Sequence, residues 1–283
     1  MNRRHFITRT GLLAVGGSHL HSQSDGAQRL RWQSDGAATI GRLGVLTPDF
    51  DPTPESEMWA MAPAGVSIHS ARVSRRRRDP RAFAEPPNVD LATDQLVELA
   101  PRSILFAYTS SSMRWAPRGR LRYLIVLKNA QKVSELFSRV ARRLPPSTCL
   151  ACVGSALSTP PWFSEAVNKQ GETYFRVKGF DVVQCTRLAP ARDSEVEIAP
   201  AELFDFVTSH TPRSAEAVFI GGNGMRAVGA ISALETRLGI PVLSANQVLL
   251  FDALSALGQA HAVRQYGKIF ERGSRPGRSL NGP

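Results

Sequence analysis

The sequence predicts an α/β fold in which helices alternate with parallel strands. Short apolar segments typical of buried strands alternate with segments of helical spacing along much of the chain. Several strand segments end in a turn of small or polar residues that leads into a helix. Strands and helices alternate in this way when helical crossovers join parallel strands. With 283 residues and 42% hydrophobic content, the chain can bury one large core or two modest ones.

In the first half, an apolar segment at 39–46 predicts the first strand, and a loop connects it to a well-marked helix start. Thr53 can cap this helix and Pro54 suits its first position. Glu55 and Glu57 place carboxylates near the positive end of the helix dipole. The next expected elements are a strand at 65–73, a helix at 89–100 and a strand at 103–107.

The second half repeats this alternation. Its expected elements are a strand at 149–157, a helix at 164–178, a strand at 180–183, a helix at 200–209, a strand at 217–220, a helix at 225–238, a strand at 241–244 and a helix at 247–257. In each half, a strand that stops at a small or polar turn leads into a helix, which is where open α/β sheets place ligands.

Residues 1–37 are expected to lie outside the fold, as a disordered leader or a twin-arginine-like signal. Arg3 and Arg4 precede a short apolar stretch, 11–17, but no A-x-A cleavage site follows it. A functional signal would make the protein periplasmic, and otherwise we expect it to be cytoplasmic. The tail at 271–283 is also expected to be disordered. No apolar run approaches the roughly 18 residues of a membrane span.

The net charge of +11 attracts anions in general and does not distinguish nucleic acid from small carboxylates. Arginines cluster at 3–4, 75–78, 114–122 and 139–143, without the interleaved aromatics on which a single-strand-binding surface stacks bases. We interpret these clusters as solvated loops and helix faces and expect no specific nucleic-acid partner. A basic nucleic-acid-binding protein is an alternative that rests on charge alone.

Cysteines and histidines give no sign of a disulfide framework or a metal site. Cys149 and Cys152 form a C-x-x-C, which could be a redox motif or two small buried residues in an apolar run, and Cys185 stands apart from them. The histidines outside the leader are isolated from one another in sequence. We therefore expect neither a metal nor another cofactor.

A family pattern extends from residue 39 to about residue 258. Its early part consists of Gly44-Val45-Leu46-Thr47-Pro48, Glu55 to Glu57 and Gly65 to Val73. Its late and more specific part consists of Arg226, Leu234-Glu235, Leu238 to Val242 and Ser244 to Gln247. Ala107 to Ser112 and the helix at 168–179 lie between them. In these residues the chain resembles the maleate isomerase and arylmalonate decarboxylase branch of the aspartate/glutamate racemase superfamily.

The resemblance implies two pseudo-symmetric α/β lobes, each a parallel sheet flanked by helices, with a cleft between them that binds small carboxylates. The first lobe would span 38–155, completed by a C-terminal helix at about 247–270, and the second would span 156–246. In the branch, each lobe contributes a turn whose N–H groups and hydroxyls hold carboxylate or enolate oxygens. A cysteine on one or both turns moves protons or attacks carbon.

The chain departs from the branch where the chemistry is done. Tyr108 stands where relatives carry a cysteine or, in decarboxylases, a glycine. Gly222 takes the place of the second cysteine, and Asp51 that of an asparagine in the first loop. Trp162 lies near the place of a threonine-proline-tyrosine motif whose tyrosine is absent here. The resemblance therefore argues against racemisation by a pair of thiols.

On this resemblance, two residues are candidate catalytic groups. Tyr108 could donate or relay a proton, although a phenol titrates near about 10, or it could fill the space that a thiol would leave. Asp51 could act as a base or could select a substrate that bears an amine or hydroxyl. The candidate substrate-binding residues are Pro48, Thr109, Ser110, Ser112, Trp162, Gly222, Asn223 and Gly224.

Two of these binding assignments have simpler alternatives. The run 221–224 could be only a tight turn that needs positive φ. Trp162 could line the cleft or be buried beside it. The sequence thus predicts a cofactor-independent isomerase or decarboxylase that acts on a small carboxylic or dicarboxylic acid without a cysteine. The alternatives are a non-catalytic carboxylate-binding protein on the same scaffold and the nucleic-acid-binding protein, and a homo-oligomer is compatible with either of the first two.

Overall fold

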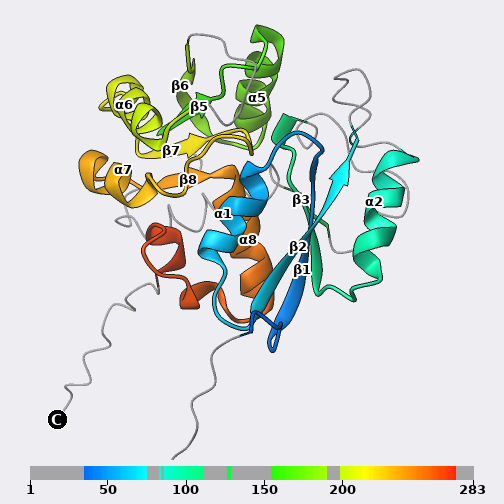
Figure 1. The fold of residues 1–283 in the computed structure, drawn as a ribbon. Coiled ribbons are helices and arrows are strands. Elements are labelled where there is room, and N and C mark those ends of the chain that lie inside the picture. The colour runs from blue at the N-terminus through cyan, green and yellow to red at the C-terminus, as the bar shows by residue number, and fades with distance from the viewer. Residues whose placement is uncertain are drawn as a thin grey trace, which may run out of the picture. The chain divides into compact units, whose positions relative to one another are not determined.

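The computed structural model describes residues 35–74, 83, 86–110, 126–128, 154–189 and 198–271. These residues form two four-stranded sheets in which every neighbouring pair of strands is parallel. Helices flank both sheets (Figure 1). The predicted fold class is confirmed.

The two sheets have the same strand order. The first sheet, ordered β2-β1-β3-β4, contains β1 (Gly41–Pro48), β2 (Val66–Val73), β3 (Ser103–Phe106) and β4 (Val126–Lys128). The second, ordered β6-β5-β7-β8, contains β5 (Gly154–Thr159), β6 (Asp181–Arg187), β7 (Ala217–Ile220) and β8 (Val242–Ser244). In both, the first strand in the chain lies between the second and the third. This repeated order is the pseudo-symmetry that the resemblance implies.

The helices are α1 (Thr53–Met61), α2 (Asn88–Val97), α5 (Glu165–Val177), α6 (Pro200–His210), α7 (Ile231–Leu238) and α8 (Ala245–Ala256), followed by the short 3-10 helices η5 (Ala260–Ala262) and η6 (Lys268–Phe270). We call the first sheet with α1 and α2 the first lobe, and the second sheet with α5, α6 and α7 the second lobe. Helix α8 contacts α1, β3 and β4 of the first lobe and β8 of the second (Figure 1). It therefore joins the two lobes.

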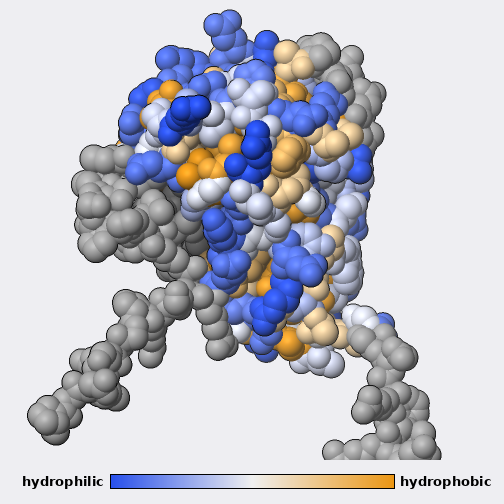
Figure 2. Space-filling model, turned by 90° about the vertical axis from the view of Figure 1, so that its left-hand side faces the viewer, coloured by the Kyte–Doolittle hydropathy of each residue, from blue (hydrophilic) through white to orange (hydrophobic). Residues whose placement is uncertain are grey.

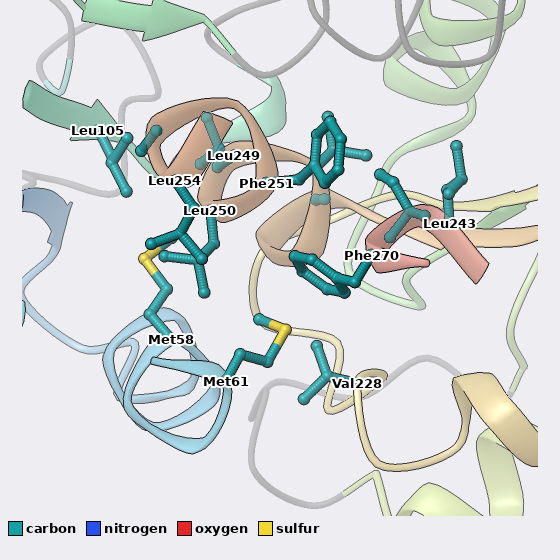
Figure 3. Packing of buried hydrophobic residues seen from close by; sticks show 14 of the residues in the cluster. Met58, Met61, Leu105, Val228, Leu243, Leu249, Leu250, Phe251, Leu254 and Phe270 are labelled. Atoms are coloured by element: carbon teal, nitrogen blue, oxygen red, sulfur yellow. The ribbon is translucent and has the colours of Figure 1, made fainter. Parts of the chain in front are cut away.

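The largest hydrophobic cluster is continuous across both sheets, because α8 contributes side chains around most of its circumference. In Figure 3, Met58 and Met61 of α1 point toward Leu250 and Leu254 of α8, with Phe270 nearby. All five side chains are at most 2% exposed. Burial of this size contributes about 1.5–3 kcal/mol per side chain, so the contact between α1 and α8 helps to hold the two lobes together.

Helix α1 begins differently from the prediction. Thr53 is its first helical residue, and the cap comes from Asp51, whose Oδ1 accepts the Thr53 N–H at 3.0 Å. A carboxylate at this position satisfies a donor that the helix leaves unpaired and also lies at the positive end of its dipole. The prediction that Thr53 caps the helix is therefore wrong.

Helices α7 and α8, which lie in the late part of the family pattern, also begin at residues other than those predicted. Helix α8 begins at Ala245, because Ser244 and Gln247 form a reciprocal capping box. Helix α7 begins at Ile231 rather than at Met225. The N–H of Val228 points to the side chain of Glu57 instead of a carbonyl one turn earlier, so a helix cannot run through it.

The other element ends shift by a few residues. Strand β1 begins and ends two residues later than the predicted 39–46, and α2 ends at Val97 rather than at residue 100. Strand β6 continues through polar residues to Arg187, as an edge strand with a solvent face can. The predicted strand at 149–157 corresponds to β5, but 149–153 lie outside the described residues.

The face in Figure 2 is covered mainly by hydrophilic residues, and hydrophobic residues form small separate groups on it. Among the described residues, no helix combines the length and the apolar character needed to cross a membrane. All four arginine clusters, residues 1–34 of the predicted leader and 272–283 of the predicted tail lie outside the described residues.

Candidate functional site

The predicted site residues lie at the carboxyl ends of the central strands. In each sheet the strand order reverses between the first and third strands, and loops from both strands leave the same edge. Open α/β sheets bind ligands at such a point. Here, loops from the two lobes enclose one small cavity, which is lined by Phe50, Asp51, Tyr108, Thr109, Ser110, Trp162, Phe163, Gly222, Asn223 and Gly224.

The cavity is small in this conformation. The space open to the centre of a water molecule is about 20 Å³, which is room for about one water. Tyr108 and Trp162 are half-buried, and Phe50 is 37% exposed. A dicarboxylate therefore needs these large side chains to move before it can occupy the cavity.

Asn223 joins the turns of the two lobes directly. Its Oδ1 accepts the N–H of Thr109 at 2.8 Å and the hydroxyl of Thr109 at 2.7 Å. Its Nδ2 donates to Oδ1 of Asn246, the second residue of α8, at 2.7 Å. All three residues are at most 4% exposed. Buried polar groups that are hydrogen-bonded to one another in this way have a fixed orientation.

The chain of hydrogen bonds continues to Glu57 on α1. Asn246 donates from Nδ2 to Glu57 Oε2 at 2.7 Å and to the carbonyl of Asn223 at 2.8 Å. The N–H of Val228 donates to Glu57 Oε1 at 2.9 Å. Burial raises the pKa of Glu57 to about 7, although the bonds from Asn246 and the backbone favour its charged form. A carboxyl group that titrates near neutrality is thus linked to the cavity through two asparagines.

Asp51 lies between the cavity and the start of α1. Its backbone carbonyl accepts Arg72 Nη1 at 2.7 Å, and Arg72 also bonds Glu55 Oε2 at 2.7 Å. Burial raises the pKa of Asp51 above its ordinary value, against the lowering effects of its hydrogen bonds to Thr53 and of the Arg72 charge. Asp51 therefore has a structural role as a helix cap, and its carboxyl also faces the cavity.

The position of Tyr108 is compatible with both interpretations made from the sequence, as a proton donor or relay and as an aromatic ring that fills space. Its ring packs on Phe83 with ring centroids 4.6 Å apart, next to a hydrophobic cluster of the first lobe. It also lines the cavity. The aromatic packing fixes the ring in place, and a fixed phenol at a cavity wall is suitable for donating a hydrogen bond to a ligand.

Comparisons with known proteins agree with this geometry. Residues 150–270 match the family model described as arylmalonate decarboxylase. A maleate cis-trans isomerase from Nocardia farcinica, a cysteine-to-serine mutant with a covalently bound succinylcysteine intermediate, is similar with a TM-score of 0.68 and 21% identity, covering 83% of this chain and 99% of that chain. The maleate isomerase of Pseudomonas putida S16, a cysteine-to-alanine variant with maleate, gives 0.68 and 18%, covering 83% and 98%.

An unliganded arylmalonate decarboxylase is similar with a TM-score of 0.64 and 17% identity, covering 81% of this chain and 98% of that chain. No curated protein matches the chain significantly in sequence. The chain has the fold of the maleate isomerase and arylmalonate decarboxylase branch. The family model and these structures confirm the resemblance predicted from the sequence.

Gly222, assigned from the sequence to the place of the branch's second cysteine, cannot carry a side chain without rearrangement. Its φ of +85° belongs to the left-handed region, and a Cβ would lie 2.7 Å from Cγ of Pro160. The preceding Gly221 differs, because a Cβ there would meet its nearest neighbour, Phe219, at 3.6 Å. The backbone conformation and the contact with Pro160 therefore both disfavour any side chain at this position of the turn.

The described thiol of this chain lies away from the cavity. Cys185 is on β6, and burial raises its pKa to about 11, so it is protonated near neutrality. Cys149 and Cys152 lie outside the described residues. Within the described ranges, His, Cys, Asp and Glu side chains form no cluster of three that could hold a metal ion.

Seven of the eight binding residues named from sequence, and both catalytic candidates, fall on described parts of the chain. Pro48 is buried at the end of β1, where its carbonyl accepts Arg72, and it is not among the cavity-lining residues. Ser112 lies outside the described residues. The other named residues line the cavity together.

Sequence reasoning missed Glu57 and Asn246 as members of the site. Both residues belong to the family pattern, and Glu57 was also interpreted through the helix dipole, but neither was assigned a role at the site. Its spacing from Thr53 and Met61, four residues to either side, places it on the buried face of α1. A carboxylate on such a face needs polar partners, and that spacing was the available signal.

Proposed function

We propose that this protein is a cofactor-independent isomerase or decarboxylase that acts on a small carboxylic or dicarboxylic acid held between its two lobes. Thr109, Ser110 and Ser112 bind one carboxylate, and Asn223 with the amides near Gly222 and Gly224 binds the other. Tyr108 donates or relays the proton that a cysteine moves in relatives. Asp51 is a base or selects the substrate, and Trp162 shapes the ligand's space.

One observation carries this proposal: the turns after β3 and β7, from different lobes, meet at one cavity and are joined by the bonds between Thr109 and Asn223. Backbone N–H groups and hydroxyls that converge at such a point can stabilise a carboxylate or enolate. In this conformation the two donors of Thr109 are bonded to Asn223, so a ligand carboxylate has to replace that acceptor. The similarity to an isomerase with maleate and to a decarboxylase supports the same class of ligand.

A second candidate is a carboxylate-binding protein without catalysis. It is favoured by Tyr108 and Gly222 at the two cysteine positions, and by the steric limit that excludes a side chain at Gly222. The two candidates share the ligand class and differ only in turnover.

A proton NMR time course in deuterated water tests the proposal. The full chain is incubated with maleate, arylmalonates, and hydroxy- and amino-dicarboxylates. We expect isomerisation, loss of carbon dioxide or deuterium incorporation with one of them, lost in Tyr108→Phe. Tyr174→Phe is the matched control, because Tyr174 is a partly buried tyrosine that packs on Phe175 and does not line the cavity.

Saturable ligand shifts without turnover would favour the binding protein instead. If the ligands cause neither shifts nor turnover, both candidates are wrong.

A further inference from the structure

The buried carboxyl of Glu57 has no role in the chemistry proposed above, yet it is connected to the cavity. Its partners are 171 and 189 residues away in the sequence, on the segment before α7 and on α8. Three successive links join Glu57 to Asn246, Asn246 to Asn223, and Asn223 to Thr109. The chain of bonds thus crosses from α1 through α8 and the second lobe's turn to the first lobe's turn.

The charge state of Glu57 fixes the direction of these bonds. A carboxylate can only accept, so Asn246 must present Nδ2 to Glu57 and Oδ1 to Asn223. Asn223 must then present Nδ2 to Asn246 and Oδ1 to Thr109. As a result, Asn223 Oδ1 accepts both the N–H and the hydroxyl of Thr109, two donors that a ligand carboxylate needs.

A proton on Glu57 Oε2 reverses this order. The carboxyl then donates to Asn246, whose amide turns over, and Asn223 turns over in response. Asn223 Nδ2 then takes the place of Oδ1, so the N–H and hydroxyl of Thr109 lose their acceptor. Thr109 and Asn223 both line the cavity, so an anion bound there can replace that acceptor. The turn costs three bonds: the one from Asn246 Nδ2 to the Asn223 carbonyl and the two from Thr109 to Asn223 Oδ1. An anion bound to the three freed donors can offset this loss.

Glu57 has its own route to solvent. It lines a second cavity of about 280 Å³, on the α1 side, together with Thr53, Ser56, Arg226, Val228 and Pro200. A proton can therefore reach Glu57 from water without passing through the ligand's cavity. Among the charged groups around Glu57, Asp51 from the loop before α1 raises its pKa, Arg226 from the segment before α7 lines the second cavity, and α8 presents the neutral Asn246.

We propose that Glu57 is a positioning residue whose protonation turns Asn246 and Asn223 and directs the donors of Thr109 to a bound carboxylate. Binding of an anionic ligand is then coupled to uptake of one proton from water by Glu57. The part of this inference that concerns the ligand rests on the proposed function; the part that concerns the asparagines does not.

NMR of the full chain without ligand tests the hydrogen-bond chain itself. Between about pH 5 and 9, the side-chain amides of Asn246 and Asn223 and the backbone amide of Thr109 should titrate together, with a midpoint near the Glu57 value of about 7. The titration should vanish in Glu57→Gln and persist in Glu235→Gln. Glu235 is a matched control, because it is a buried carboxyl with a raised pKa that accepts two backbone N–H groups, from Val242 and Lys268.

Calorimetry with maleate tests the coupling. Titrations of the full chain at about pH 7.5 in two buffers of different ionisation enthalpy give the number of protons taken up. With a pKa of about 7, Glu57 is partly protonated at this pH, so we expect uptake of about three quarters of a proton. Well above the pKa of Glu57, the affinity should weaken about tenfold per pH unit. Both effects should disappear in Glu57→Gln, whose amide can mimic the protonated carboxyl, and remain in Glu235→Gln.

The outcomes separate the two proposals. If the three amides of the wild-type protein do not titrate together, the inference is overturned whether or not maleate binds, and this test does not depend on any variant folding. It is also overturned if maleate binds and Glu57→Gln takes up the same number of protons. A joint titration without binding of maleate or arylmalonates would support the hydrogen-bond chain and count against the proposed function.

Discussion

The turn after β3 and the turn after β7 occupy equivalent places in two sheets of the same strand order, but they present different chemistry. The first turn carries the side chains of Tyr108, Thr109 and Ser110 into the cavity. The second turn, 221–224, presents mainly backbone, because three of its four residues are glycines and only Asn223 carries a side chain. The same strand order therefore carries a turn with several polar side chains in one lobe and a turn made mainly of backbone in the other.

The difference follows from what surrounds each turn. Phe83 packs on the Tyr108 ring, so the first turn can hold a large side chain at the cavity wall. Pro160 lies against the α-carbon of Gly222, so the second turn cannot. Asn223 is held instead from the first lobe's side, through Asn246 and Glu57. Four substitutions test this contrast, in order of expected effect on the free energy of unfolding.

Asn223→Ala should have the largest effect. It removes the acceptor for two donors of Thr109 and the donor to Asn246, all buried, and each such loss costs about 1–3 kcal/mol. We expect a loss of about 4 kcal/mol in urea unfolding. Asn168→Ala, which removes one bond to Thr159 within the second lobe, should cost about 1 kcal/mol. Equal losses would mean that Asn223 does not join the lobes.

Glu57→Gln should change how stability depends on pH. The folded-state pKa of Glu57 is raised from 4.5 to about 7, so the folded protein holds this proton more tightly than the unfolded chain. The stabilisation is fully present below 4.5 and is lost as pH rises through 7, roughly 3 kcal/mol in all. Urea unfolding across this pH range gives the free energies of unfolding of wild type and Glu57→Gln, and their difference should change by that amount. A difference that does not change with pH would contradict the raised pKa of Glu57.

The sequence predicted the α/β class, the residues of both turns and the order of the described strands and helices, except for β4 and the two 3-10 helices after α8, which were missed. The predicted features depend on local patterns. Gly221-Gly222-Asn223-Gly224 follows an apolar strand and could be placed at a strand end without knowing its neighbours. The prediction that the two turns meet at one site came from the family pattern. The role of Glu57 could not be predicted, because its partners are 171 and 189 residues away.

The errors at element ends have the same origin. Helix α7 begins late because the N–H of Val228 is directed to Glu57, and α1 is capped by Asp51 from outside the predicted helix. In both cases a carboxylate accepts a backbone N–H near the start of the helix, a contact that hydrophobic periodicity does not reveal. Local propensity therefore gave the elements, and long-range polar contacts set where two of them begin.

Gly222→Ala tests whether the second turn is limited by sterics. An L-residue at φ +85° costs about 1–2 kcal/mol, and the added Cβ meets Pro160 at 2.7 Å, so we expect a loss of about 2 kcal/mol or somewhat more. Gly221→Ala is the neighbouring control, where the contacts of a Cβ are ordinary, and it should change unfolding by less than about 0.5 kcal/mol. If Gly222→Ala were as stable as Gly221→Ala, the second turn would not be limited by sterics.

Tyr108→Phe should affect stability least and turnover most. The ring remains packed on Phe83, so unfolding should change by less than about 1 kcal/mol. If the phenol moves the proton, turnover of whichever acid the NMR panel identifies should fall by about 100-fold or more, because positioned acid–base groups contribute about that factor. Tyr108→Leu removes the ring and should lower both stability and turnover. Full activity in Tyr108→Phe with a loss confined to Tyr108→Leu would make the ring a packing element, and the proton transfer would then belong to Asp51, the other titratable side chain at the described cavity wall besides Tyr108.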